Sequence, residues 1–206
     1  RFFMRALKHC GYQDLDEPFA GLFTQGMVLH QTYQNDAAEW LFPKEVNTDA
    51  AGHLTDDSGR AVTIGRLEKM SKSKKNVVDP MNIISAFGAD TARWFVMSDS
   101  PPERDVEWTA SGAEATFKHL SRVWALSVRV AEMPLDHQGE GDQDLLRATH
   151  RAIAEVTAGI EGFAFNKAIA KLYEFTNAIG RASASTIAMK DALRVLAQLM
   201  QPMTPH

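Results

Sequence analysis

A cluster of cationic side chains within eleven residues is the segment of this sequence most suited to binding an anion. Five positive charges against one negative leave a local charge of +4 over residues 66–76: Arg66, Lys69, Lys72, Lys74 and Lys75 against Glu68. Two ammonium groups about 6 Å apart repel by roughly 0.7 kcal/mol even in water. A polyphosphate would cancel that repulsion and accept hydrogen bonds from the lysines and serines. We therefore expect a mobile loop that becomes ordered when it binds an anion.

Strands and short helices are predicted on both sides of this basic loop. The apolar run 26–29 predicts a short buried strand. Residues 45–67 predict a hairpin, in which 46–49 pairs with 61–64 through a turn at 57–59. After the loop, Asp79-Pro80 offers a capping side chain followed by proline at the first helical position. We expect helices from there to Gly88 and from about 89 to 97, besides a first helix over residues 1–10.

Beyond residue 109 the apolar residues recur at helical spacing in four segments. The stripes are Phe117, Leu120, Trp124 and Val128; Leu146, Ile153, Val156 and Ile160; Phe165, Ile169, Leu172, Phe175 and Ile179; and Leu193, Leu196 and Met200. Thr109 or Ser111 could cap the first of these helices. Four amphipathic helices with short links favour an antiparallel bundle. The change of pattern predicts a domain boundary near residue 110.

Composition narrows the class of protein. The 206 residues are 45% hydrophobic and 23% charged, which is typical of a soluble globular protein. The net charge of −4 excludes a global basic field, so any RNA binding must rest on local basic patches. The single cysteine, Cys10, excludes a disulfide framework and a multi-cysteine zinc site, and suits a reducing cytosol. His9 beside it has no cluster of partners, so no bound metal is expected.

The ends of the sequence predict a segment of a longer protein. The first residues, Arg1-Phe2-Phe3, lack a methionine and already follow a helical pattern, and Pro205-His206 comes directly after a helical run. No signal peptide opens the chain, and no apolar run reaches the length needed to cross a bilayer. We expect an excised piece with no membrane partner.

The order of residues in the basic loop suggests a family. Most charge runs are solvated surface loops. However, Lys69-Met70-Ser71-Lys72-Ser73 resembles the signature (KMSKS) loop of the class I aminoacyl-tRNA synthetases, and it lies between a predicted strand and a predicted helix, as that signature requires. The resemblance implies a ligase in which an amino-acid carboxylate attacks the α-phosphate of ATP and pyrophosphate leaves. Such a reaction needs fixed positive charge on the phosphate oxygens that gain charge.

Roles within the loop follow by position from this resemblance. Lys72 is the first candidate for a catalytic contact with the ATP phosphates, and Lys69 is the second. Ser71 and Ser73 would shape the loop or donate hydrogen bonds, with Met70 between the first lysine and the serines. Lys74 and Lys75 lie outside the core motif. Gly26, Met27 and Val28 would line the adenine pocket, or would form only a buried strand.

Stretches along nearly the whole chain resemble the leucyl branch of this family. They are residues 24–29, 101–108, 111–112, 122–124, 163–170 and 202–206. Residues 76–80 and 88–93 resemble class I synthetases in general. Residues 31–65 show the weakest resemblance, because this branch varies there in length. The string from Pro101 to Trp108 favours leucine over isoleucine, valine or methionine, whose synthetases share the loop.

The leucyl resemblance implies a fold that is mainly α with an α/β part. Residues 1–65 would end a Rossmann-like catalytic domain with a short hairpin insertion, 66–110 would carry the KMSKS loop and a connecting helical region like a stem-contact fold, and 111–206 would begin the helical tRNA-binding bundle. The partners implied are leucine, tRNA(Leu) and ATP accompanied by Mg²⁺, in a cytoplasmic monomer. The family's His-x-Gly-His signature and editing domain are missing from the sequence, so the isolated chain should be inactive.

Several residues keep a structural alternative. Arg104 and Asp105 could form a surface ion pair. Trp108 and Trp124 are expected to be core anchors rather than base-stacking platforms, and Asp90 a helix N-cap rather than a catalytic acid. The candidates for phosphate contacts on the bundle are Arg122, Arg129, Lys167 and Lys171, although a solvated helix face explains most such charges.

A competing interpretation comes from a different class of protein. The chain could be a non-catalytic RNA-binding helical module that keeps a degenerate loop. The intact string Lys69–Ser73 argues against it, because a module without ATP chemistry needs no such order.

Overall fold

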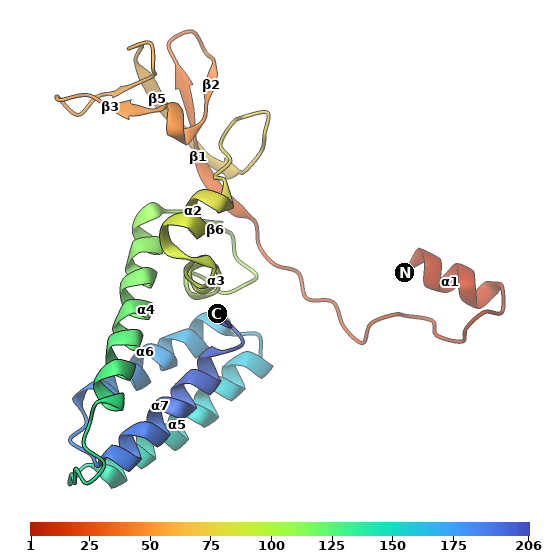
Figure 1. The fold of residues 1–206 in the computed structure, drawn as a ribbon. Coiled ribbons are helices and arrows are strands. Elements are labelled where there is room, and N and C mark those ends of the chain that lie inside the picture. Colours follow the sequence, from red (N-terminus) through yellow and green to blue (C-terminus); the bar gives the residue numbers. More distant parts are fainter.

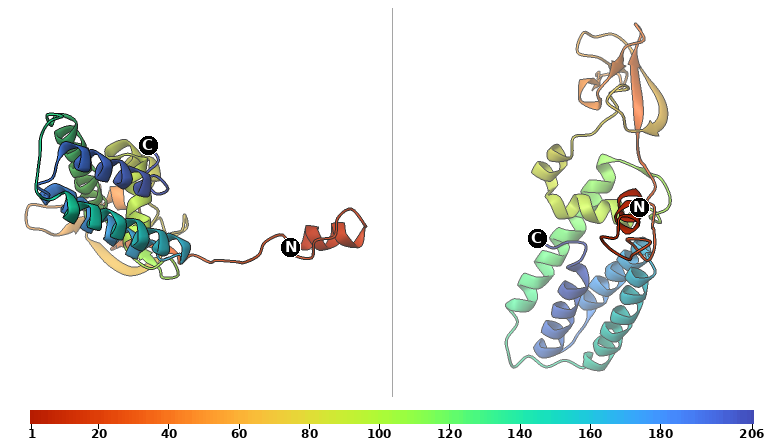
Figure 2. Two further views of the ribbon diagram at one scale, coloured as in Figure 1. Left: turned by 90° about the horizontal axis from the view of Figure 1, so that it is seen from below. Right: turned by 90° about the vertical axis from the view of Figure 1, so that its right-hand side faces the viewer.

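A computed structural model describes residues 1–206, in which a small sheet and a four-helix layer lie at opposite ends of the molecule with two short helices between them (Figures 1 and 2). The elements in chain order are α1 (Phe2–His9), β1 (Val28–Asn35), β2 (Trp40–Leu41), the 3₁₀ helix η1 (Pro43–Glu45), β3 (Asn47–Thr48), β4 (Leu54–Thr55), β5 (Val62–Lys69), α2 (Pro80–Phe87), α3 (Ala89–Ser98), β6 (Val106–Glu107), α4 (Ala110–Ala131), α5 (Asp142–Glu161), α6 (Phe165–Arg181) and α7 (Thr186–Met200). Helix α1 buries none of its residues and stands away from the rest, at the end of an extended segment (Figure 1). The expected mainly α architecture with a smaller β part is confirmed.

Strand β1 is the centre of the larger sheet. It pairs antiparallel with β2 and β5 and parallel with β6. The buried hydroxyl of Thr32 on β1 donates to the carbonyl of Arg66 on β5, 3.0 Å away. Glycine at position 65 permits this approach, because a β-carbon there would collide with the Thr32 hydroxyl. The pairing of β1 with β5 delivers the chain directly into the basic loop.

The hairpin expected over residues 45–67 is wrong in its pairing. Strand β3 pairs with β4, whereas β5 pairs with β1. The reason is local: the Asp49 carboxylate accepts the backbone N–H groups of Ala51 and His53, which closes a tight turn before residue 57 is reached. A second turn follows, closed by Asp56, whose carboxylate accepts the N–H groups of Ser58 and Arg60. Two Asx-type turns therefore replace the single turn.

The helix signals after the loop are confirmed. The Asp79 carboxylate accepts the backbone N–H of Met81 at 2.9 Å, and Pro80 is the first residue of α2. Gly88, with a positive φ of 85°, separates α2 from α3, a conformation that glycine adopts at little cost. Helix α4 begins at Ala110, where the Thr109 hydroxyl accepts the N–H of Gly112.

The four-helix layer has one continuous apolar core, as expected. Its fully or nearly buried side chains include Trp94, Val130, Leu145, Val156, Ile169, Leu172, Phe175, Ile179, Met189, Leu196 and Met203. Helix α5 packs closely on α6, where Gly159 leaves room for Ala168. The stripes predicted for α6 and α7 point inward. None of the helices has both the length and the apolar character needed to cross a membrane.

The inward faces of α4 and α5 differ from the predicted ones. Trp124 is 73% exposed, so its expected role as a core anchor is wrong. The buried side chains of α4 lie outside the predicted stripe, and this helix also packs against α3. They are Ala113, Thr116, His119, Leu126 and Val130. On α5 Leu145 and Ala152 are buried in place of the predicted Leu146 and Ile153, whereas Val156 is buried as predicted.

A buried histidine joins α3, α4 and α6. The His119 ring lies 3.9 Å from the Tyr173 ring and 5.4 Å from the Trp94 ring, measured between centroids. Trp94 Nε1 donates to the Tyr173 hydroxyl at 3.2 Å. His119 Nε2 has no hydrogen-bond partner, and Nδ1 lies 3.3 Å from the Arg122 guanidinium. Burial, together with the Arg122 charge, lowers the pKa of His119 from 6.5 to about 4.

Acid should destabilise the bundle through this histidine. The folded state favours neutral His119, whereas the unfolded chain binds a proton there near pH 6.5. The free energy of unfolding is therefore undiminished above pH 6.5 and decreases as the pH falls toward 4. At pH 5 the loss should be about 2 kcal/mol. Urea unfolding of wild type and His119→Phe at pH 7.5 and 5.0 would measure it, with the exposed His150→Gln as the matched control. An equal pH dependence in all three proteins would contradict the expectation.

Candidate functional site

The basic loop folds back onto the strands that flank it. It leaves β5 after Lys69, and the backbone N–H of Met70 donates to the carbonyl of Val28 at 3.4 Å. At the far side of the loop the Asn76 side chain is completely buried. The loop is therefore attached to β1 at its start and at its end.

Asn76 makes the attachment at the end of the loop. Its Oδ1 accepts the N–H of Ser71 at 2.8 Å, and its Nδ2 donates to the carbonyls of His30, Glu68 and Lys69 at 3.1, 3.2 and 3.4 Å. One amide thus joins both strands and the loop. Sequence reasoning missed this residue, because an asparagine after a run of lysines has no local signal of burial.

The two serines of the motif build a tight turn. The hydroxyls of Ser71 and Ser73 lie 3.3 Å apart, and Ser71 Oγ accepts the N–H of Lys74 at 3.3 Å. The N–H of Lys75 donates to the carbonyl of Lys72 at 3.3 Å, which closes the turn. The serines therefore shape the loop, and Lys72 lies at the exposed apex.

The four lysines of the loop fall into two pairs. Lys74 makes an ion pair with Glu68, and Lys75 Nζ lies 3.9 Å from the Glu45 carboxylate. Lys69 and Lys72 are exposed and form no ion pair within the protein. The two motif lysines thus keep uncompensated charge that an anion could neutralise.

The segment before β1 lies beside the start of the loop. Gly26 donates its N–H to the carbonyl of Pro102 at 2.7 Å, and a β-carbon at this position would collide with the Arg104 carbonyl. The N–H of Met27 donates to the Asp105 carboxylate at 2.7 Å. Asp105 therefore anchors this backbone, and the alternative of an ion pair between Arg104 and Asp105 is wrong.

The structure thus brings the predicted site residues together at one place. Val28 pairs with Val106 of β6 and accepts the N–H of Met70, so Gly26–Val28 adjoin the loop. Gly26 and Met27 precede β1 and Met27 is exposed, so the alternative of a fully buried strand fails for these two residues. A nucleotide could place its flat base against residues 26–28 and its phosphates against the neighbouring cationic loop.

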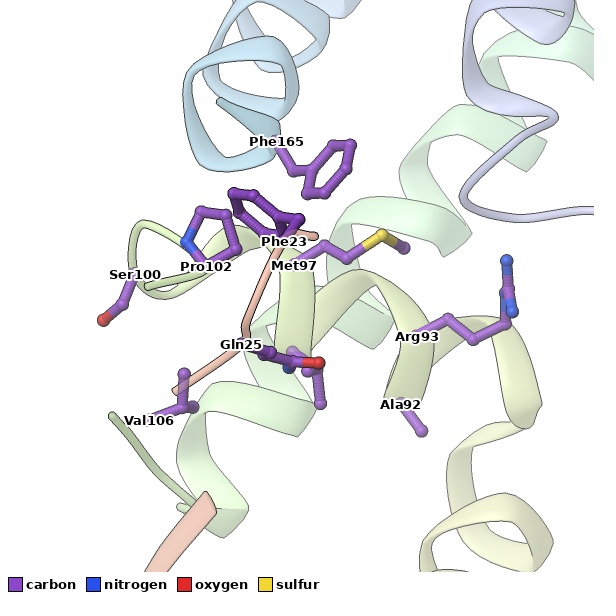
Figure 3. A pocket seen from close by; sticks show the side chains of 10 residues that line it. Phe23, Gln25, Ala92, Arg93, Met97, Ser100, Pro102, Val106 and Phe165 are labelled. Carbon is purple, nitrogen blue, oxygen red and sulfur yellow. The ribbon is translucent and has the colours of Figure 1, made fainter. Parts of the chain in front are cut away.

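A separate cavity lies between α3, the segment 99–106 and the residues before β1. It encloses about 570 Å³ and gathers Phe23, Phe165 and Met97 at one end, with Arg93 at the other (Figure 3). Arg93 donates to the carbonyls of Pro202 and Met203, both at 2.9 Å. None of the loop lysines lines this cavity.

Asp90 has a different role from the one expected. Gly88 is the N-cap residue of α3, so the prediction of Asp90 as a side-chain cap is wrong. Its carboxylate instead accepts the N–H of His206 at 2.9 Å and lies 3.0 Å from the ring Nδ1. Asp90 therefore ties α3 to the segment that follows α7.

The basic residues of the bundle differ in how much charge they leave free. Lys171 pairs with Glu155 and Glu174, and the Glu174 hydrogen bond is the main cause of its raised pKa. Arg129 donates to the carbonyl of Gly180 at 3.2 Å and makes no ion pair. Together with Arg122 and Arg181 it lines a groove between α4 and α6 that contains no carboxylate.

Comparison with known protein families matches two parts of the chain. Residues 57–109 match the family of class I tRNA synthetases (I, L, M and V), and residues 142–206 match the anticodon-binding domain of tRNA ligases. The first match contains the basic loop, and the second contains three of the four helices of the bundle.

Individual relatives extend the likeness over the whole chain. A leucine–tRNA ligase of Roseobacter denitrificans is 58% identical over 212 residues, which cover 100% of this chain and 24% of the relative. The LeuRS–tRNA–LeuAMS complex of Agrobacterium radiobacter K84 contains a chain that is 30% identical, with a TM-score of 0.72, matching 100% of this chain and 23% of its own. Methionyl-tRNA synthetase of Mycobacterium tuberculosis, at 18% identity and a TM-score of 0.58 over 67% of this chain and 34% of its own, shares the fold. The chain thus spans about a quarter of the leucine–tRNA ligases that it matches, and the predicted resemblance to leucyl-tRNA synthetases is confirmed.

Proposed function

We propose that this chain, which is similar to leucine–tRNA ligases over its whole length, is the part of such a ligase that carries the phosphate-binding loop and begins the RNA-binding helices. The longer protein would activate leucine with ATP and transfer it to tRNA(Leu). The observation that supports this proposal best is the division of the loop lysines, which leaves Lys69 and Lys72 free at the position of the class I signature.

The loop would act on the departing pyrophosphate. When the leucine carboxylate attacks the α-phosphate, negative charge grows on the phosphate oxygens. Lys72 at the apex and Lys69 at the end of β5 would place ammonium groups on those oxygens, while Ser71 and Ser73 hold the turn. Gly26, Met27 and Val28 would lie along the adenine ring, with Met70 packed between the two parts. Lysine suits such a loop because its charge sits on a long flexible stem.

A metal ion would enter with the nucleotide. No three His, Cys, Asp or Glu side chains gather closely enough to hold one. The phosphates themselves are the ordinary ligands of Mg²⁺ in such sites. The residues of this chain would therefore bind the phosphates directly, and any metal would be carried by ATP.

The chain would be divided as its sequence suggests. Residues 1–65 would complete a Rossmann-like catalytic domain with an inserted β arm, 66–110 would hold the loop and the connecting helices, and 111–206 would begin the tRNA-binding bundle. The match of residues 142–206 to an anticodon-binding domain supports the last part. A cytoplasmic, monomeric enzyme is proposed for the longer protein.

Leucine-dependent exchange between ATP and pyrophosphate on the longer protein tests this function. Leucine should support exchange, whereas isoleucine, valine and methionine should support far less, and the 206-residue chain alone should be silent. Exchange with another of these amino acids would reject the leucyl assignment. Absence of exchange with all four would reject the ligase and favour the RNA-binding module.

A further inference from the structure

The second pair of loop lysines, Lys74 and Lys75, contacts aromatic rings of a segment at the edge of the sheet. We define the aromatic arm as residues 40–45, which comprise β2, Phe42 and η1. Lys74 Nζ lies 5.8 Å from the centre of the Trp40 ring, and Lys75 Nζ lies 5.4 Å from the centre of the Phe42 ring. Both distances lie within the range of cation–π attraction.

A carboxylate also lies beside each of the two lysines, and we call the ring and the carboxylate around each ammonium group the grip. Lys74 makes its ion pair with Glu68 of β5, and Lys75 lies near Glu45 at the end of the aromatic arm. Each ammonium group therefore has one aromatic face and one carboxylate. A solvated surface loop has no need for two such paired arrangements.

The backbone at Lys75 needs this support. Its φ is 52°, in the left-handed region that residues other than glycine, asparagine and aspartate seldom adopt. Such a conformation persists where the surroundings hold it in place. The surroundings here are the aromatic arm on one side and the buried Asn76 on the other.

The grip also changes the electrostatics of the loop. With Lys74 and Lys75 compensated, the repulsion that opposes a compact loop is reduced to that among Arg66, Lys69 and Lys72. The second half of the loop is thereby fixed, while its first half stays exposed at the apex. The entropy lost when the loop takes up the shape needed for the chemical step is correspondingly smaller.

We infer that Trp40 and Phe42 are positioning residues, which act through Lys74 and Lys75 to hold the loop in the shape that presents Lys72 to the ATP phosphates. This inference rests on the proposed function. Because the grip acts on loop geometry rather than on nucleotide binding, it should affect the rate of the chemical step more than the apparent affinity for ATP.

The test uses the longer protein with Trp40→Leu and Phe42→Leu combined. Its kcat in leucine-dependent exchange should fall about tenfold with little change in the KM for ATP, and the amides of residues 70–76 should exchange hydrogen about tenfold faster. Lys44→Ala is the matched control, since Lys44 lies over the same Phe42 ring, 5.7 Å from its centre, but outside the loop. The control should match wild type in both measurements.

A second variant shows whether the arm acts through the lysines. Lys74→Met combined with Lys75→Met removes the two ammonium groups and leaves the aromatic arm unchanged. This variant keeps the test possible if the arm variant fails to fold. It should produce the same loss, and all four substitutions together should cost no more than either pair. Additive losses, a rate at or above that of wild type, or unchanged hydrogen exchange would each overturn the inference. If leucine does not support pyrophosphate exchange by the wild-type protein, the proposed function is refuted but the grip is not. Faster hydrogen exchange of the 70–76 amides in the arm variant would still demonstrate the grip.

Discussion

Replacing Lys72 by alanine should lower kcat for leucine-dependent pyrophosphate exchange by about 100-fold, the usual effect of losing one preorganised charge at a reacting oxygen. Lys72 is exposed at the apex of its turn and makes no ion pair, so the substitution removes charge without breaking contacts within the protein. The KM for leucine should change little, because the lysine would act on the phosphates. Steady-state exchange on the longer protein, with leucine and ATP varied in turn, measures both quantities.

The control for Lys72→Ala is a lysine of the bundle. Lys118 is exposed on α4 and paired with Glu114 at 2.8 Å, so Lys118→Ala removes an equal charge at another place. It should retain the wild-type rate. If both variants lost activity equally, a general electrostatic effect would explain the result and the role of the apex lysine would be rejected. If Lys72→Ala kept full activity, the proposed contact with the phosphates would be wrong.

Asn76→Asp should disrupt the attachment of the loop to the sheet. The new carboxylate could still accept the N–H of Ser71, but it would face the three carbonyls to which the amide now donates. A buried acceptor without a donor costs about 1–3 kcal/mol, and a buried charge costs more. We expect amide protection at the β1–β5 junction to fall by at least about 100-fold, which corresponds to roughly 3 kcal/mol of local stability.

Hydrogen exchange followed by mass spectrometry would report this loss in peptides from β1 and β5. Asn82→Asp is the matched control, because Asn82 is exposed in the first turn of α2, where a negative charge is tolerated. That variant should keep wild-type protection. Normal protection in Asn76→Asp would show that the amide network does not hold the loop. The longer protein carrying Asn76→Asp should also lose most of its exchange activity, since the turn that presents Lys72 begins at Ser71.

Much of the local structure followed from the sequence. Asp79-Pro80 predicted the start of α2, Gly88 its end, and the apolar spacing predicted the inward faces of α6 and α7. These features depend on residues within a few positions of one another, where capping and helical periodicity act. The order Lys69–Ser73 likewise identified the loop and its family resemblance before any geometry was known.

Contacts between distant segments were decided by the tertiary structure. The sequence placed Trp124 inside, because periodicity does not say which neighbour a helix meets. It placed Asp90 at a helix cap, because residue type alone does not show that its carboxylate binds His206. Here α4 is shared between α3 and the bundle, so its buried face shifts to Thr116 and His119. Likewise, two Asx turns redirected β5 from the expected hairpin to β1.

For the basic loop, the sequence by itself determined which charges are present and their order, and this order carries the resemblance to the class I signature. The sequence alone does not distinguish the lysines that are paired within the protein from those that stay exposed, because all four lie within seven residues: Lys69, Lys72, Lys74 and Lys75. Only the folded sheet brings Trp40 and Phe42 to Lys74 and Lys75, and leaves Lys69 and Lys72 exposed. The physical reason is that ion pairs and cation–π contacts depend on distances of a few ångströms between segments about thirty residues apart, which are set by strand pairing rather than by local propensity.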